Sequence, residues 1–204
     1  MYIPAHFAED RLPVLHDAIR AGGLANLVTM TSEGLIATPL PLMLDAEAGP
    51  YGTLFGHVAR ANPQWRLSDP AVPALAMFMG PDAYISPSFY ATKQETGRVV
   101  PTWNYVTVHA YGPAVFSEDL TELRKAVTRL TERHEAGRAL PWAVTDAPEP
   151  FVAGQLKGIV AFRLEITRLQ GKWKASQNRN EADRAGVRAG LAAGGGDAMR
   201  ALIP

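Results

Sequence analysis

The sequence predicts a mainly β fold with peripheral helices, of the α+β class, arranged as a mostly antiparallel barrel. Many short segments rich in β-branched and large apolar residues are separated by turn residues, and they do not alternate strictly with helices as parallel sheets require. The 204 residues are 47% hydrophobic and 20% charged, an ordinary globular composition that supports one substantial core. We therefore expect a single domain over residues 1–204, with a C-terminal helical extension over about residues 179–204.

The chain begins with a predicted helix and three predicted strands. Residues 10–22 carry apolar side chains at helical spacing, and the predicted helix ends at the first of two consecutive glycines. Three short apolar segments follow, divided by Ser-Glu-Gly and Ala-Gly-Pro turn sequences, at residues 24–31, 35–44 and 51–58. We interpret these three segments as an antiparallel meander.

The middle of the chain predicts a short helix, two strands and a loop. Asn62 is followed by a proline, which fits an N-cap and a first helical position, so a short helix is expected over residues 63–67. Two further strands are expected at residues 74–79 and 83–87. The polar residues 93–100 contain a glycine and predict a mobile loop over or beside a site.

The second half predicts two strands and two capped helices. Residues 105–116 have extended character, and Asp119 then opens a capping box for an amphipathic helix that ends near Gly137. Apolar and polar residues alternate over residues 160–166, which predicts a half-buried strand that runs directly into a lysine-rich motif. Asn180 fits the N-cap of a final helix.

Composition excludes several functions. Twenty basic and twenty acidic side chains cancel, so no overall field draws the protein to nucleic acid. The lack of cysteine removes disulfides, thiolate nucleophiles, zinc ribbons and iron–sulfur clusters, and the histidines lack the spacing of metal ligands. The sequence has neither a dinucleotide fingerprint nor a Walker-type loop. It also lacks a secretory apolar core and a membrane-spanning segment, so we expect a cytoplasmic protein without metal or membrane partner.

A first candidate site follows the strand predicted over residues 51–58. His57 lies at the end of this strand, and Arg60 and Asn62 follow in the turn. A planar guanidinium and backbone N–H groups at such a turn can converge on a phosphate. The alternative is a surface arginine and a histidine satisfied by the core.

A second candidate site is the lysine-rich motif. Lys172 and Lys174 are two residues apart, so in a regular strand they point to the same face and repel each other unless an anion or a carboxylate lies between them. Ser176 and Gln177 follow with hydroxyl and amide groups that suit the edge of a heteroaromatic ligand. The alternative is a solvated strand edge on which lysines prevent aggregation.

A third candidate site combines aromatic and amide side chains. Trp103 and Asn104 follow the predicted loop, and a segment with two tyrosines precedes it. Aromatic rings beside amides can form a stacking wall for a flat cofactor, with Asn104 reading its edge. The alternative is that these rings only fill the core or a subunit interface.

Five stretches occur in order over nearly the whole chain: MYIPAHF, HVARANPQW, GPDAYISPSFY, VPTWNYVTVHAYG and LKGIVAFRLEITRLQGKWKASQNRNEADRAGV. Together they resemble the PaiB-like family of FMN-binding negative transcriptional regulators. The resemblance implies a split β-barrel of the pyridoxamine-phosphate-oxidase-like kind, in which a single FMN-binding domain assembles as a homodimer and holds FMN between the subunits. It also implies a bacterial cytoplasmic protein.

By this resemblance nine residues contact the cofactor: His57, Arg60, Asn62, Trp103, Asn104, Lys172, Lys174, Ser176 and Gln177. The first three would hold the flavin phosphate, the last four would meet the flavin or its phosphate, and Trp103 and Asn104 would lie near the ring.

The leading hypothesis is a dimeric flavoprotein whose isoalloxazine ring accepts and returns electrons, as in an FMN-dependent oxidoreductase. No acid–base residue stands out in the sequence. One alternative is a ligand-sensing transcriptional repressor that acts through DNA or a protein partner, although neither charge nor a helix-turn-helix pattern supports DNA binding. The other alternative is a haem-binding split-barrel protein with His57 or His109 as the axial ligand.

Overall fold

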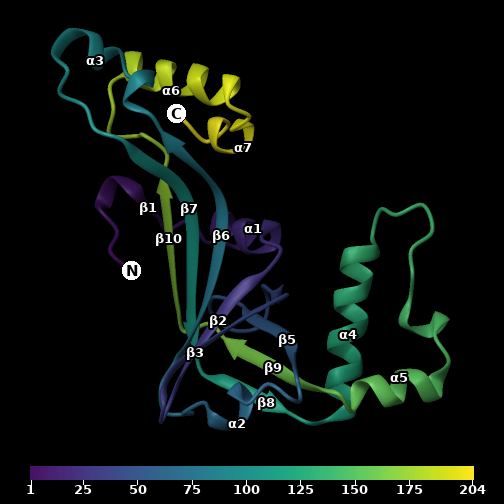
Figure 1. Ribbon diagram of the computed structural model, residues 1–204. Coiled ribbons are helices and arrows are strands. Elements are labelled where there is room, and N and C mark those ends of the chain that lie inside the picture. The colour runs from purple at the N-terminus through teal and green to yellow at the C-terminus, as the bar shows by residue number, and fades with distance from the viewer. The chain divides into compact units, whose positions relative to one another are not determined.

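The computed structural model describes all 204 residues, which divide into two compact units (Figure 1). Unit 1 comprises Met1–Gly22, Phe78–His109 and Gln170–Pro204, and unit 2 comprises Gly23–Met77 and Ala110–Leu169. Three long strands, β6, β7 and β10, contribute residues to both units. No helix combines the length and the apolar character needed to cross a membrane.

Unit 1 contains one end of the larger sheet. Its strands lie in the order β1 (Ala8–Glu9), β10 (Arg168–Lys174), β7 (Thr102–Gly112) and β6 (Ala74–Ile85). Strand β1 pairs with β10 antiparallel, with Ala8 opposite Lys172. The helices of this unit are η1 (Ala5–Phe7), α1 (Leu12–Ala21), η2 (Pro87–Phe89), α3 (Ala91–Thr96), α6 (Glu181–Ala193) and α7 (Asp197–Arg200).

The C-terminal helices of unit 1 close a hydrophobic core over the ends of strands β6, β7 and β10. Asn180 caps α6 as predicted, since its side chain accepts a hydrogen bond from the backbone N–H of Asp183 at 2.8 Å. The buried residues of this core are Ile85, Tyr90, Val106, Ala175, Val187, Leu191, Met199 and Ile203. The core therefore fixes the turn that follows β10, where the lysine-rich motif ends.

Unit 2 contains two groups of strands. In the larger sheet, β2 (Ala25–Thr31) lies next to β6, and β3 (Gly34–Leu40) lies next to β2 at the edge. The second sheet has the order β4 (Met43–Asp45), β5 (Thr53–Ala59), β9 (Ile159–Glu165) and β8 (Ala114–Ser117). Strand β2 pairs with β3, β4 with β5, β5 with β9, and β8 with β9, all antiparallel. The helices are α2 (Gln64–Leu67), α4 (Leu120–Glu135), η3 (Val144–Asp146) and α5 (Glu149–Leu156).

Helices α4 and α5 pack on the second sheet of unit 2 (Figure 1). Asp119 caps α4 as predicted, because its carboxylate accepts hydrogen bonds from the N–H groups of Thr121 and Glu122. A small core joins α4, η3, α5 and β9 through Leu123, Val144, Val152, Leu156 and Ala161. This packing places one face of α4 opposite strands β5, β9 and β8.

The prediction of a mainly antiparallel fold with peripheral helices is confirmed, but the meander is wrong. The segment predicted as one strand over residues 35–44 breaks at Pro41, so β3 and β4 belong to different sheets. Proline lacks the N–H that a continuous ladder would need. Likewise, the segment over residues 105–116 is interrupted at Pro113 and forms β7 and β8.

Three further expectations are corrected. The segments at residues 74–79 and 83–87 form one strand, β6, which continues through Pro81. The predicted loop at residues 93–100 begins inside α3, where Asp183 accepts hydrogen bonds from the N–H and hydroxyl of Thr92. Strand β9 does not run directly into the lysine-rich motif, since the chain bends after Glu165 and starts β10 in the other sheet.

Candidate functional site

The turn after β10 lines a small pocket within unit 1, which we call the cationic pocket because two cationic side chains line it. It has a volume of about 180 Å³. Its lining residues are Phe7, Tyr90, Val100, Pro101, Thr102, Asn104, Lys174, Ser176, Asn178 and Arg179. Two cationic side chains and several hydroxyl and amide groups converge here, which is the donor set that an anionic ligand requires.

Lys174 supplies one of the two positive charges of the cationic pocket. Its ammonium donates hydrogen bonds to the hydroxyl of Thr102 and the carbonyl of Trp103. Burial lowers the pKa of Lys174 from its usual value, and the nearby charges of Lys172 and Arg179 lower it further. None of the ion pairs in the chain includes Lys174 or Arg179, so no carboxylate compensates these charges.

Ser176 holds the turn in a conformation that few residues adopt. It is the one non-glycine residue of the chain with a positive φ, at 62°. The side-chain amide of Asn104 donates to the Ser176 hydroxyl at 2.9 Å, and both residues are buried. Gln177 braces the same turn, since its side chain accepts from the N–H of Ala175 and donates to the carbonyl of Trp173. Such strain persists only where the surroundings fix it, often at a functional site.

Tyr90 contributes an unused donor to the cationic pocket. Its hydroxyl is buried and has no hydrogen-bond partner, and the Arg179 guanidinium lies 4.6 Å from the centre of its ring. Buried polar groups are nearly always satisfied, so the unpartnered hydroxyl of a residue that lines a pocket with two cations suits an anionic oxygen. The pocket therefore fits a phosphate group.

Two residues of the same sequence motifs lie outside this pocket lining. Lys172 is buried, and its ammonium donates to the carbonyl of Tyr2 at 3.2 Å and lies 5.1 Å from the centre of the Tyr105 ring. Trp103 is 54% exposed and meets the Tyr84 ring edge to face, with ring centres 6.0 Å apart. The structure thus brings together Asn104, Lys174 and Ser176, braced by Gln177.

Arg60 and Asn62, which lie in unit 2, are engaged by protein groups. The Arg60 guanidinium forms an ion pair with Glu118, and its Nε donates to the carbonyl of Lys157 at 2.6 Å. Asn62 donates to the hydroxyl of Thr38 and accepts from the N–H of Gln64, both at 2.9 Å. The N-cap of α2 is Pro63 and not Asn62, so the predicted cap is displaced by one residue. A phosphate at Arg60 would compete with the carboxylate of Glu118.

His57, also in unit 2, lies beside a different cavity. This cavity of about 260 Å³ is lined mainly by apolar residues of α4, α5 and the segment between them, and neither Arg60 nor Asn62 lines it. The Nδ1 atom of His57 is buried without a partner, and burial lowers the pKa of the ring below its usual value of 6.5. Burial therefore favours the neutral form of His57.

Sequence reasoning missed Thr102 and Arg179 as residues of the cationic pocket, and it placed Tyr90 only in a possible aromatic stacking wall. The packing of α6 and β7 brings Tyr90 to the turn after β10. Arg179 directly follows the Ser-Gln-Asn sequence. This position beside predicted ligand-binding residues was the one local signal that Arg179 belongs to the site.

Comparison with known proteins identifies the family. Residues 1–168 match the sequence family described as "Putative FMN-binding domain". This chain belongs to that family. Membership confirms the expected cofactor, FMN. Of the predicted contacts, Lys172, Lys174, Ser176 and Gln177 lie beyond the matched residues.

Relatives of this chain occur in bacteria and fungi. The chain is 37% identical over 183 residues to the "Protease synthase and sporulation protein PAI 2" of Bacillus subtilis, a match that covers 90% of this chain and 85% of the relative. It is also 34% identical to the uncharacterised protein AN0679 of Emericella nidulans, covering 99% of this chain and 94% of that protein.

Solved structures support the fold of this family member. The flavocytochrome Anf3 from Azotobacter vinelandii aligns with a TM-score of 0.62 at 13% identity, covering 90% of this chain and 78% of that one. The conserved hypothetical protein Rv2991 from Mycobacterium tuberculosis aligns with a TM-score of 0.60 at 13% identity, covering 89% and 95%. The predicted split-barrel fold is confirmed.

Proposed function

We propose that this protein is a homodimeric, redox-active flavoprotein that receives the FMN phosphate in the cationic pocket of unit 1. One observation carries the proposal: Lys174 and Arg179 line a pocket together with Tyr90, whose buried hydroxyl has no partner, and no ion pair neutralises the two cations. Charge-assisted hydrogen bonds to a phosphate would satisfy all three groups. FMN, when bound, supplies the electron-transfer chemistry, and the protein supplies binding and orientation.

The size of the pocket limits which part of FMN it takes. A volume of about 180 Å³ is smaller than the roughly 300–1,000 Å³ of sites that enclose a whole drug-sized ligand. The phosphate end fits, and the flavin ring lies outside the pocket. An exposed aromatic ring lies next in sequence to the pocket residue Asn104. This ring is Trp103, which packs edge to face on Tyr84. An exposed indole of this kind suits stacking on a flat ring.

Three variants test this assignment by fluorescence titration of FMN into the purified protein. Lys174→Ala removes one charge, and we expect FMN binding to weaken by about 1.5–3 kcal/mol, or roughly 10- to 150-fold in Kd. Tyr90→Phe removes only an oxygen and is expected to weaken binding by about 1 kcal/mol. Arg60→Ala tests the alternative site, because it should weaken binding by about 1.5–3 kcal/mol only if the phosphate lies at Arg60 and displaces Glu118.

Lys93→Ala is the matched control, because this exposed lysine lies in the same unit on α3 and does not line the pocket. It should leave FMN affinity unchanged. If Lys174→Ala and Tyr90→Phe bind FMN as tightly as the wild type, the cationic pocket does not hold the phosphate. A loss confined to Arg60→Ala would place the phosphate at the turn after β5 instead.

A haem-binding role is the second candidate, and His57 is the observation that favours it. Its Nδ1 is buried without a partner, and the ring borders an apolar cavity of about 260 Å³. A neutral imidazole in an apolar cavity has the chemistry of an axial haem ligand. Titration with haem should then give a Soret band that His57→Ala abolishes. Failure of the wild type to take up haem rejects this role.

A regulatory role is the third candidate, suggested by the name of the Bacillus subtilis relative. In this role bound flavin would change the affinity of the protein for DNA or for a protein partner in the cytoplasm. The formal net charge of zero offers no general attraction to DNA. A promoter fragment should therefore be tested by gel shift at two salt concentrations, because a direct complex must weaken as salt rises.

A further inference from the structure

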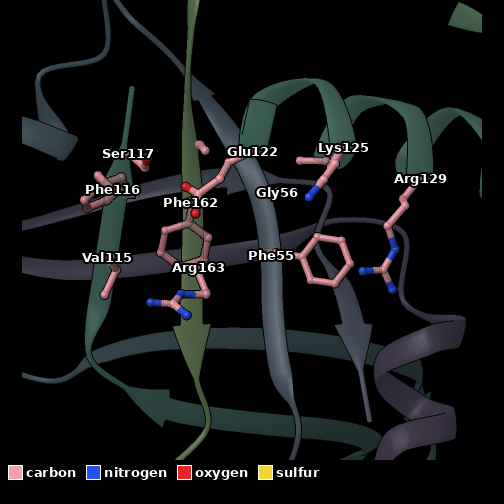
Figure 2. A pocket seen from close by; sticks show the side chains of 12 residues that line it. Phe55, Gly56, Val115, Phe116, Ser117, Glu122, Lys125, Arg129, Phe162 and Arg163 are labelled. Atoms are coloured by element: carbon pink, nitrogen blue, oxygen red, sulfur yellow. The ribbon is translucent and has the colours of Figure 1, made fainter. Parts of the chain in front are cut away.

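A larger cavity lies within unit 2, between helix α4 and strands β5, β9 and β8 (Figure 2). Its volume is about 440 Å³. Helix α4 lines it with Glu122, Lys125, Ala126 and Arg129. These residues recur at the three- and four-residue spacing of a single helix face. We call it the α4 cavity.

The strand side of the α4 cavity is set by the register of the second sheet. Phe55 on β5 pairs with Arg163 on β9, and Arg163 pairs in turn with Val115 on β8. Residues directly opposite each other on neighbouring strands share one face of a sheet. The Arg163 side chain therefore lies between an aromatic ring and an aliphatic side chain, all of them lining the cavity.

Positive charge dominates this cavity. The exposed residues Lys125, Arg129 and Arg163 line the cavity with one carboxylate, Glu122. Asp119, which precedes α4, also interacts electrostatically with Lys125. Arg129 is engaged, since its guanidinium lies 4.2 Å from the centre of the Phe55 ring and 3.6 Å from the carboxylate of Asp45. Lys125 and Arg163 take part in none of the ion pairs or side-chain hydrogen bonds of the chain.

We propose that the α4 cavity binds a small organic anion with an apolar ring. Its carboxylate or sulfonate lies between Lys125 and Arg163, and its ring lies against Phe55 and Val115. Like charges at one cavity repel each other, and an anion between them turns repulsion into charge-assisted hydrogen bonds. The volume falls within the range of small-molecule sites, and apolar walls with a few convergent polar groups are typical of them.

This site is independent of the proposed flavin phosphate site, because the two are built from different residues in different units. Figure 2 shows Lys125 and Arg129 reaching from the helix toward Phe55. A ligand with charge alone would leave the Phe55 and Val115 surface unused, and a neutral ring would leave Lys125 and Arg163 unpaired. The combination selects an amphipathic anion.

The test compares two fluorescent probes that share their aromatic body. 1-Anilinonaphthalene-8-sulfonate carries a sulfonate, and N-phenyl-1-naphthylamine lacks it. Each probe is titrated into the wild type, into the double variant Lys125→Gln/Arg163→Gln, and into the control double variant Arg138→Gln/Lys157→Gln. The control removes two exposed charges of the same unit that do not line the cavity.

The sulfonate probe should bind the wild type and the control equally, and its Kd should rise at least tenfold in the Lys125/Arg163 double variant. The Kd of the neutral probe should stay within twofold in all three proteins. Circular dichroism melts establish that the variants are folded. An unchanged Kd of the sulfonate probe in the double variant would overturn the proposal.

FMN separates this site from the flavin site. Saturating FMN should leave the bound sulfonate probe in place, and the double variant should bind FMN as the wild type does. Competitive displacement of the probe by FMN would overturn the proposal, because the cavity would then belong to the flavin. The probe experiment uses neither Lys174 nor Tyr90. Its result therefore stands even if the variants of the cationic pocket bind FMN as the wild type does.

Discussion

At the scale of single residues, Ser176 links backbone strain to the cationic pocket. Its φ of 62° costs an L-residue about 1–2 kcal/mol, and its hydroxyl accepts the hydrogen bond of the buried Asn104 amide. The strain and the hydrogen bond act in opposite directions on stability. Replacing the side chain in two ways separates them.

We expect Ser176→Ala to destabilise the protein by about 1–3 kcal/mol, because it leaves the Asn104 amide unsatisfied and keeps the strain. Ser176→Gly loses the same hydrogen bond but adopts positive φ freely, so it should be more stable than Ser176→Ala by about 1 kcal/mol. Urea unfolding of both variants measures this difference. A glycine variant less stable than the alanine variant would show that the turn is not strained.

His57 gives stability a pH dependence. Burial lowers the pKa of the folded state below 6.5, so the unfolded chain binds a proton at a pH where the folded protein does not. Stability is then complete above the unfolded pKa and falls as pH decreases below about 6.5. The slope cannot exceed about 1.4 kcal/mol per pH unit, and it is smaller here because the ring is only partly buried.

The measurement is the free energy of unfolding at pH 7.5 and pH 5.5 for the wild type and for His57→Gln. The wild type should lose more stability over this interval than the variant, by less than about 1 kcal/mol. An equal loss in both proteins would mean that His57 does not titrate differently on folding.

At the scale of elements, helix α6 depends on its glycines. A Cβ at Gly186 would lie 1.9 Å from the carbonyl oxygen of Phe89, a backbone atom of η2. Helix α5 offers the opposite case, because a Cβ at Gly154 would meet nothing within 4 Å. The two positions share the intrinsic preference of a helix for alanine over glycine, about 1 kcal/mol.

We expect Gly186→Ala to destabilise the protein by about 1–3 kcal/mol despite its better helix propensity, because α6 must shift away from η2. Gly154→Ala should stabilise it by up to about 1 kcal/mol. Denaturant unfolding compares the two variants. A stabilising Gly186→Ala would contradict the close packing of α6 on η2.

Sequence reasoning succeeded where the signal was local. The caps at Asp119 and Asn180 and the apolar spacing of residues 12–19 predicted three helices that the structure contains. It failed where contacts between segments distant in the sequence determine the structure. Nothing local shows that Pro41 moves the chain from one sheet to another, or that α5, with a proline and a glycine in eight residues, is helical.

The same distinction holds for the site. Asn104, Lys174 and Ser176 were predicted from residue chemistry, and the structure places them in one pocket lining. Tyr90 was expected only in an aromatic stacking wall, because tertiary packing alone places it beside Lys174 and Arg179. The α4 cavity was missed because Lys125 and Arg129 have the pattern of an ordinary solvated helix face until Arg163 is placed opposite them.

At the scale of the whole molecule, family membership and local geometry make complementary contributions. The family match covers residues 1–168 and establishes the FMN-binding family, while the cationic pocket takes Lys174, Ser176 and Arg179 from the residues that follow. That the two compact units act as one domain, and that two copies assemble around FMN, remain predictions. Light scattering of the purified protein with and without FMN measures the assembly.

The phosphate is the group that the cationic pocket is proposed to recognise, so riboflavin, which lacks it, isolates the central claim. The decisive measurement is the Kd of FMN and of riboflavin for the wild type and for Lys174→Ala. We expect the wild type to prefer FMN at least tenfold, and Lys174→Ala to lose most of that preference while its riboflavin affinity stays the same. Equal preference for FMN in both proteins would contradict the assignment of the phosphate to this pocket.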